Sequence, residues 1–422
     1  MISLTLAAIG YKIIVGEKRM KSLKALYRIG AGPSSSHTMG PEKIAKEFLS
    51  RHGGADEYIV TLYGSLAATG NGHGTDEVLK KTIPGRVEIV CDNEMKDLPH
   101  PNTMDITAVY GDEKFTERAY SVGGGAIAFE GKECGDGEDV YPLNSFREIA
   151  EYCKKRDMRL YDYVRECEGD EIFEYLSGVW ERMKLTIKEG LAATGTLPGG
   201  LDIGRKAKFL YRQHYLGETA EVRADRLVCA YAYATSEQNA AGGTIVTAPT
   251  CGACGVMPSA LKFMQDEHGF TDEKVINAIA TGGVIGNLIK TNASISGAEC
   301  GCQAEIGSAC AMTAAALGEL FDMSLEQIEY AAELSIEHHL GLTCDPVRGL
   351  VQIPCIERNA VAAMRAINAL SISNFLTYTR KVSFDTIVRT MYETGKDLGR
   401  GYRETGESGL AKLYRESDAA CD

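Results

Sequence analysis

The chain is organised around the stretch NASISGAECGCQAEIGSAC (292–310) and its continuation CDPVRGLVQIPCIERN (344–359). Five of the 13 cysteines lie in it, at positions 300, 302, 310, 344 and 355. Clustered thiolates in a reduced protein indicate zinc or iron–sulfur chemistry more than disulfides. Cysteines that only pack a core would explain the spacing equally well, because no compact C-x-x-C-x-x-C run is present.

The residue identities in this stretch are more specific than the spacing of its cysteines. SISGAECGCQAEIG and CDPVRGLVQIPCIERNA resemble the catalytic part of the iron–sulfur L-serine dehydratases, and the resemblance extends from Lys21 to the chain end. It implies a [4Fe–4S] cluster held by Cys302, Cys344 and Cys355, with one iron open. It also implies L-serine as the substrate, pyruvate and ammonia as products, no pyridoxal phosphate, and a homodimer.

Length and composition limit the remaining possibilities. The 422 residues predict two or three domains, and 44% hydrophobic residues suffice for a large core. A net charge of −13 with interspersed signs argues against a nucleic-acid partner. No apolar run reaches about 18 residues, so we expect no membrane span. Residues 1–19 lack a basic n-region, so we interpret them as an extension upstream of a start at Met20, in a cytoplasmic protein.

Near the N-terminus, GAGPSSSHTMGPEKIAKEFLSRHGG indicates a loop that leads into a helix, with Pro41 in its first turn. Hydroxyls and amides at a helix N-terminus suit a carboxylate, although an ordinary N-cap would explain the serines as well. With the resemblance, we expect this loop to bind the substrate carboxylate and His37 to orient the substrate. The loop residues are Ser34, Ser35, Ser36 and Thr38.

A second histidine lies in the run GNGHGTDE, where glycines 70, 72 and 74 surround His73 and let the backbone bend closely. The pattern matches no P-loop or dinucleotide fingerprint, which excludes a nucleotide interpretation. Thr75 or Asp76 is expected to cap the following helix. GPSSSHT and GHGTD match the same dehydratase family in the same order, so we assign His73 as the base for the Cα proton, with the two histidine roles exchangeable.

The fold class is α+β. Four strand patterns, EYIVTLYGS, RVEIVC, DITAVY and FTERAYSV, predict an α/β sandwich domain over residues 20–143, which SVGGGAI should end. Residues 144–170 are interpreted as a connecting arm. Residues 171–422 then form a mostly helical catalytic domain, rich in Ala and Gly on more than one helix face. Ser324 and Gln327 make a capping-box pattern.

Other thiols and histidines carry weaker signals. Cys251 and Cys254 form a C-x-x-C pair without a βαβ context or a second pair at zinc spacing. The family text there is TAPTNGAAG, and Cys300 replaces an aliphatic residue, so these three thiols depart from the family. His338 and His339 point in different directions on a helix, which favours packing over shared ligation.

The resemblance implies further site residues and leaves alternatives. Thr75, Asn292 and Ser294 are expected to contact substrate. Cys421 in the tail is expected to bind the open iron as a fourth ligand at rest and to leave when L-serine binds. L-threonine is an alternative substrate, because one methyl group is worth only about 1–3 kcal/mol of discrimination. A non-catalytic iron–sulfur redox sensor would explain the thiols but not both histidine loops. A pyridoxal-phosphate lyase would need a Schiff-base lysine, and no lysine has a suitable setting.

Overall fold

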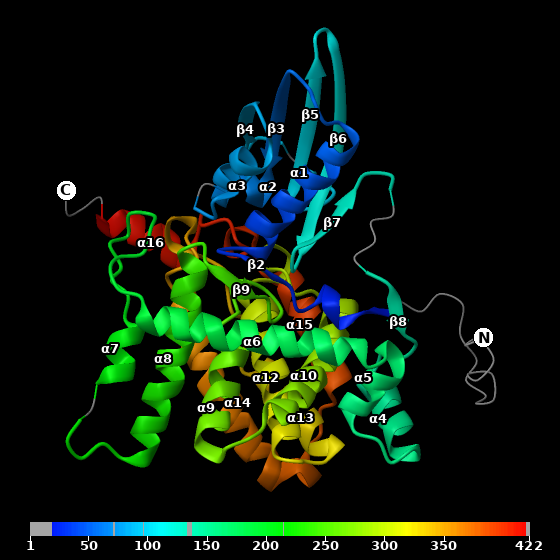
Figure 1. The fold of residues 1–422 in the computed structure, drawn as a ribbon, viewed down its shortest axis with the longest axis vertical. Coiled ribbons are helices and arrows are strands. Elements are labelled where there is room, and N and C mark those ends of the chain that lie inside the picture. Colours follow the sequence, from blue (N-terminus) through cyan, green and yellow to red (C-terminus); the bar gives the residue numbers. More distant parts are fainter. Residues whose placement is uncertain (1–18, 71, 96, 133–136, 214, 419–422) are drawn as a thin grey trace.

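The protein is described here by a computed structural model that covers residues 19–70, 72–95, 97–132, 137–213 and 215–418. A mixed sheet with its helices lies at one end of the molecule, and a bundle of helices forms the other end (Figure 1). The α+β class is confirmed. The expected N-terminal extension, apart from Arg19, lies outside the described residues, and so does Cys421.

The sheet contains the four predicted strands and one more. Its order is β4-β3-β5-β6-β7; β3 and β4 are parallel, and the other neighbours are antiparallel. Val60 pairs with Ile89 on one side and with Ile106 on the other. The bounds are β3 (Glu57–Tyr63), β4 (Arg86–Asp92), β5 (Thr103–Tyr110), β6 (Glu113–Gly123) and β7 (Ala126–Phe129).

The prediction that SVGGGAI ends the sheet is wrong. Gly123, Gly124 and Gly125 have φ values of 98°, 57° and 78°, and they turn the chain back so that β7 pairs with β6. Glycine adopts this left-handed backbone without the steric cost of a side chain. The expected close approach is present, because a Cβ on Gly124 would lie 2.9 Å from Ile295 Cδ1 in the helical part.

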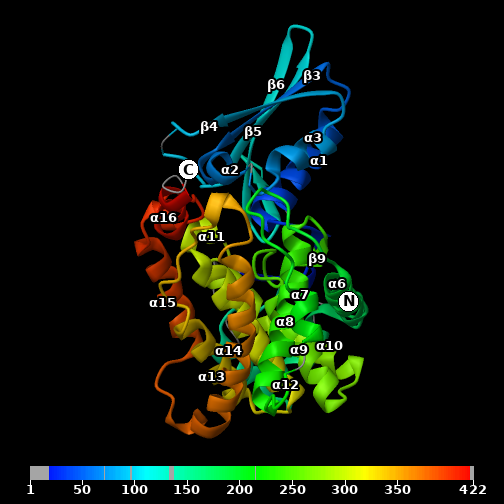
Figure 2. The ribbon, with the colours of Figure 1, turned by 90° about the vertical axis from the view of Figure 1, so that its left-hand side faces the viewer.

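Helices α1 (Gly40–Arg51), α2 (Gly64–Thr69) and α3 (Thr75–Thr82) accompany the sheet, and α1 and α3 are seen beside it in Figure 2. Pro41 lies in the first turn of α1, as predicted. Ile44 and Ala45 lie four and three residues before Phe48, so all three side chains share one face of this helix. They are buried there and join the core of the sheet.

Two short strand pairs tie the sheet end to the helices. β1 (Met20–Lys21) pairs with β8 (Asp139–Tyr141), and β2 (Ile29–Ala31) pairs with β9 (Thr244–Val246), both antiparallel. The β2–β9 pair is an exception to the expectation that the chain is all helical after residue 171. It explains why GGTIVTAP, a β-branched run between helices, is extended.

The rest of the chain is helical, as predicted, and the capping box of Ser324 and Gln327 is confirmed. No helix in the described ranges is long and apolar enough to span a bilayer. The helices are α4 (Phe146–Lys155), α5 (Leu160–Glu168), α6 (Glu171–Ala192), α7 (Ala207–Arg212), α8 (Ala220–Ala240), α9 (Val256–His268), α10 (Asp272–Asn292), α11 (Gly297–Cys300), α12 (Ser308–Leu320), α13 (Leu325–Glu337), α14 (Cys355–Leu376), α15 (Phe384–Asp397) and α16 (Gly409–Asp418).

Helix α12 is the centre of the bundle, and all of its residues are buried. Its small residues let neighbouring helices come close: a Cβ on Gly282 of α10 would lie 2.6 Å from the Met312 carbonyl oxygen. The predicted interior packing of Ala- and Gly-rich helices is therefore confirmed. α12 and α13 form a hairpin, and its two ends carry Cys302 and Cys344.

Two glycines of α6 give a matched test of this packing. A Cβ on Gly190 would overlap the Ala234 backbone of α8, whereas a Cβ on Gly178 would meet nothing within 4 Å. We expect Gly190→Ala to lower the free energy of unfolding by about 1–3 kcal/mol through overpacking. Gly178→Ala should raise it by about 0.5–1 kcal/mol through helix propensity. Denaturant titrations followed by circular dichroism measure both, and equal effects would contradict the packing.

Candidate active site

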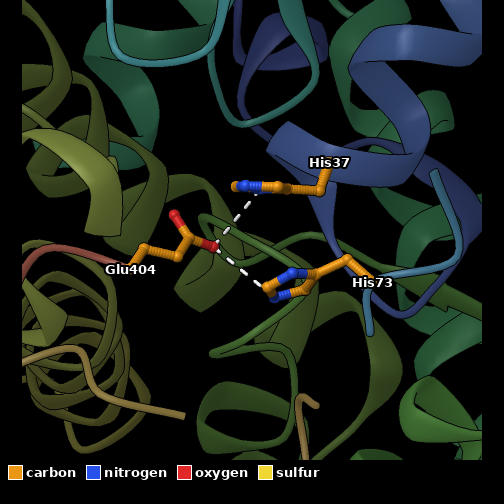
Figure 3. A group of neighbouring side chains, drawn as sticks. All are labelled: His37, His73 and Glu404. Carbon is orange, nitrogen blue, oxygen red and sulfur yellow. Dashed lines mark ion pairs between the residues drawn. The ribbon is translucent and has the colours of Figure 1, made fainter. Parts of the chain in front are cut away.

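Two buried histidines from separate loops stack on each other. His37 lies in a π-helical turn, η3 (Ser35–Met39), and His73 lies in the turn before α3. Their ring centroids are 4.4 Å apart at an interplanar angle of 29°. Figure 3 shows the two rings side by side, facing the carboxylate of Glu404.

Crossed hydrogen bonds hold the two histidine loops together. Thr38 Oγ1 donates to the His73 carbonyl at 2.8 Å, and Thr75 Oγ1 donates to the His37 carbonyl at 2.6 Å. The expectation that Thr75 or Asp76 caps α3 is wrong, because the N-cap is Gly74, with φ 67° and no side-chain cap. The Thr75 hydroxyl instead donates its hydrogen bond to the His37 carbonyl.

The serines of the loop also hold His37. Ser34 Oγ accepts from the His37 amide at 3.1 Å, as an N-cap does, and Ser36 Oγ lies 2.9 Å from His37 Nδ1. On the other side of the ring, His37 Nε2 lies 3.0 Å from Ser65 Oγ. Ser35 is buried beside them. The structure therefore brings the predicted serines to the histidines.

The partners of each ring assign its tautomer, because a carbonyl oxygen can only accept. His73 Nδ1 lies 3.0 Å from the Thr69 carbonyl, so Nδ1 carries the hydrogen and Nε2 has the free electron pair. Ser65 donates its hydrogen to the Glu404 carbonyl at 2.7 Å, so it accepts from His37 Nε2. His37 Nδ1 is then the acceptor for Ser36. His73 Nε2 is therefore the one unprotonated nitrogen of the two rings that accepts no hydrogen bond from a hydroxyl group in the described chain.

Burial keeps both rings neutral near pH 7. Desolvation lowers the pKa of His73 from 6.5 to about 4, partly offset by its bond to Thr69. Desolvation, followed by repulsion from His73, lowers the pKa of His37 well below 6.5. A neutral imidazole can accept a proton, so the pair is suited to general-base chemistry.

Glu404 is a site residue that the sequence interpretation missed. It is buried, and its Oε1 lies 3.4 Å from His37 Nδ1 and 3.7 Å from His73 Nε2 (Figure 3). Desolvation, then Glu305 and Cys302, raise the pKa of Glu404, and the Ala298 amide opposes this. The residue follows η7 (Arg400–Tyr402), and its neighbours form no motif that would have marked it.

Two of the predicted iron ligands, Cys302 and Cys344, lie close together next to Glu404. Cys302, Cys344 and Glu305 place one ligand atom each within 4.8 Å of one another. Cys302 precedes a second π-helical turn, η4 (Gln303–Gly307), and Cys355 opens α14. Cys355 is outside this group of close ligand atoms; desolvation, then the negative charge of Cys302, raise its pKa. Soft thiolates in a buried group fit an iron–sulfur cluster.

The electrostatics around these thiols suit ligand thiolates. The pKa of Cys302 is lowered by a hydrogen bond from Cys344, against desolvation, and by Arg358. Arg358 is held by a bond from Nη1 to the Thr343 carbonyl at 2.6 Å. A guanidinium beside a thiol favours the thiolate, the form that binds metals.

Backbone contacts join the thiols to the histidines. Cys344 donates its amide to the Tyr402 carbonyl at 2.8 Å, and Glu404 donates its amide to the Cys344 carbonyl at 2.8 Å. A Cβ on Gly72 would lie 2.7 Å from the carbonyls of Arg348 and Gly349, in the loop after Cys344. The glycine before His73 thus permits direct contact with the thiol loop.

Some predicted site residues lie elsewhere. Asn292 is exposed, and it donates to the Asn144 carbonyl at 2.7 Å and to the Leu288 carbonyl at 3.0 Å. Ser294 bonds to Glu299 and accepts from the Ser296 amide at 3.0 Å, which shapes the loop before α11. The structure does not bring either side chain to the histidine pair.

The three thiols that depart from the family text, Cys251, Cys254 and Cys300, are buried against neighbouring side chains and helices. Cys251 and Cys254 form a small buried cluster with Met39 and Ile245, and desolvation raises the pKa of both thiols. Cys300 lies against α15, where a Cβ on Gly395 would meet it at 2.5 Å. His339 Nδ1 bonds to the Ser335 carbonyl at 2.6 Å, in line with the packing role expected of it.

An open cleft of about 570 Å³ leads to this region. Ser65, Arg403 and Thr405 line it, so it reaches the partner of His37 and both neighbours of Glu404. Lys396 and Arg400 add positive charge to its wall. Asp97 and Glu299 also line it, so the cleft presents both signs of charge to a small ligand.

Comparison with known proteins agrees with this arrangement. Residues 22–86 match the family model described as serine dehydratase beta chain, and residues 86–411 match the serine dehydratase alpha chain. The chain belongs to the serine dehydratase family. It is 40% identical to L-serine dehydratase 1 of Escherichia coli K12, covering 93% of this chain and 99% of that protein. L-serine dehydratase of Streptomyces coelicolor is 39% identical, over 92% and 97%.

The lowered pKa of His73 predicts a pH effect on stability. The unfolded chain binds a proton near pH 6.5 and the folded dehydratase only near 4, so stability is complete above 6.5 and falls with pH through this window. Between about pH 7.5 and about pH 5, His73 should account for a loss of about 2 kcal/mol. Denaturant unfolding at both values should show a smaller loss for His73→Gln; equal losses would contradict the assignment.

Proposed function

We propose that this serine dehydratase converts L-serine to pyruvate and ammonia, with a [4Fe–4S] cluster held by Cys302, Cys344 and Cys355. The observation that carries the proposal is the contact of the Cys344 loop with both the histidine turn and Glu404. This contact supports a single site that combines soft thiolates with a neutral imidazole pair. A redox sensor without catalysis would have no use for the histidine pair.

His73 is the proposed base for the Cα proton. Its Nε2 has the electron pair that no hydroxyl engages, and its Nδ1 is oriented by the Thr69 carbonyl. When bound, the cluster supplies an iron that acts as a Lewis acid towards the substrate hydroxyl. Loss of the Cα proton and of the hydroxyl leaves aminoacrylate, which hydrolyses in water to the two products.

His37 and the serine loop are proposed to position the substrate. Ser36 and Ser65 hold the two nitrogens of His37, so this ring is fixed in orientation. The first-turn amides of Ser35 and Ser36, at the start of η3, suit the substrate carboxylate. Preference for L-serine over L-threonine and assembly as a homodimer remain parts of the proposal that rest on the family.

The thiol assignment gives a direct metal test. We expect about four irons per chain after anaerobic purification. Cys344→Ser should lose the iron and the turnover of L-serine, because a hydroxyl is a poor ligand for iron–sulfur clusters. Iron analysis and visible absorption measure the cluster. Cys251→Ser is the matched control and should keep the iron; an active Cys344→Ser protein without iron would refute the assignment.

The base assignment is tested separately. His73→Ala should lower kcat for L-serine by about 10²- to 10⁴-fold with the iron content unchanged. Exchange of the Cα hydrogen with solvent deuterium, followed by NMR, should be lost in the same variant. His52→Ala, a change at a partly exposed histidine on the sheet end, should leave both unchanged. Surviving exchange in His73→Ala would place the base elsewhere.

A further inference from the structure

Glu404 has no role in the chemistry proposed above, although it lies between the histidines and the thiols. Its Oε1 is near both imidazoles, and its Oε2 is buried and makes no hydrogen bond within the described chain. A buried polar atom without a partner is costly, and native proteins rarely keep one without a reason. Oε2 is therefore a candidate contact for a ligand.

The backbone of Glu404 is held in an unusual conformation. Its φ is 57°, a left-handed value that non-glycine residues rarely adopt. Its amide is bonded to Cys344, and its carbonyl accepts from Ser65. Strained residues that are fixed by several contacts occur preferentially at ligand sites. Both contacts of this residue lead to other parts of the active site, so the carboxylate has a defined position.

Gly297 shows which groups face the same space as Oε2. A Cβ at this position would lie 3.3 Å from Glu404 Oε2, 3.2 Å from Cys344 Sγ and 2.9 Å from Glu305 Oε2. Glu404 Oε2, Cys344 Sγ and Glu305 Oε2 are therefore neighbours around the Gly297 backbone, and a small molecule that contacts the Glu404 carboxylate is within reach of the thiol of Cys344. Because residue 297 is a glycine, no side chain of its own separates these three groups.

Resting on the proposed function, we propose that Glu404 binds the α-ammonium group of the amino-acid substrate. The hydroxyl, the Cα hydrogen and the carboxylate of L-serine have partners in the arrangement above, whereas the ammonium group has none. An ammonium ion taken out of water needs an opposite charge. Two neutral histidines cannot supply it. Burial, then the neighbouring Glu305 and Cys302, raise the pKa of Glu404, and a bound ammonium group opposes this shift because an opposite charge favours the ionised carboxylate. Glu305 lies among the thiols, so Glu404 is the carboxylate that faces both the thiols and the base.

Two inert ligands separate this role from a purely structural one. L-alanine carries the ammonium and carboxylate groups, and 3-hydroxypropionate carries the hydroxyl and carboxylate groups. Binding of each to the anaerobically purified full chain is measured by calorimetry. Glu404→Gln keeps the shape of the side chain and removes its charge, so it should weaken the binding of L-alanine by about 10- to 100-fold. The affinity for 3-hydroxypropionate and the iron content should not change.

Glu407→Gln is the matched control, because Glu407 is exposed three residues further along the same segment, and it should change neither affinity. Equal weakening of both ligands in Glu404→Gln would overturn the proposal in favour of a structural role. Unchanged L-alanine binding, or loss of iron, would also overturn it. If the parent protein contained no iron and did not consume L-serine, the proposed function itself would fail, which is distinguishable from these outcomes.

Discussion

Two backbone hydrogen bonds between Cys344 and the segment 402–404 hold the active site together. They place a carboxylate from near the end of the chain beside a predicted iron ligand, and Ser65 then joins the same segment to the histidine turn. Three distant parts of the sequence meet at these bonds. The thiols, the histidines and Glu404 belong to different structural elements, and these bonds fix the positions of those elements relative to one another.

The interior around this pairing is polar but well ordered. The Thr69 carbonyl orients His73, and the Ser65 hydroxyl, which donates its hydrogen to the Glu404 carbonyl, orients His37. The two threonines bond to the carbonyl of the opposite histidine. In a site of low dielectric such bonds are stronger than in water, and they limit each ring to one tautomer and orientation. A base that is fixed in this way needs little reorganisation when it accepts a proton.

The helical bundle supplies rigidity. α12 is buried along its whole length, and the glycines of α10 let the two helices approach closely. Cys355 begins α14, and Cys302 and Cys344 lie in the segments next to the two ends of the α12–α13 hairpin, so packed helices anchor the thiol segments. Catalytic groups on such elements are held more accurately than groups on loops alone.

Local patterns in the sequence were sufficient for much of this protein. Alternation marked β3 to β6, the pair Ser324 and Gln327 marked the start of α13, and the family motifs marked the histidines and thiols. Short strands such as β7 and β9 were missed, because a few residues next to glycines give too weak a periodicity. Asn292 was expected at the substrate because it adjoins a motif, but its side chain instead ties α10 to the connecting arm.

The sequence by itself determined most of the elements, the candidate ligand thiols and the family, because these depend on residues close together in the chain. Only the tertiary structure revealed Glu404, the crossed threonine bonds and the tautomers. The Ser65–Glu404 bond joins residues 339 positions apart, and such a contact produces no periodic pattern in the sequence. It forms because both backbones are fixed by their own domains, and burial then requires each polar group to find a partner.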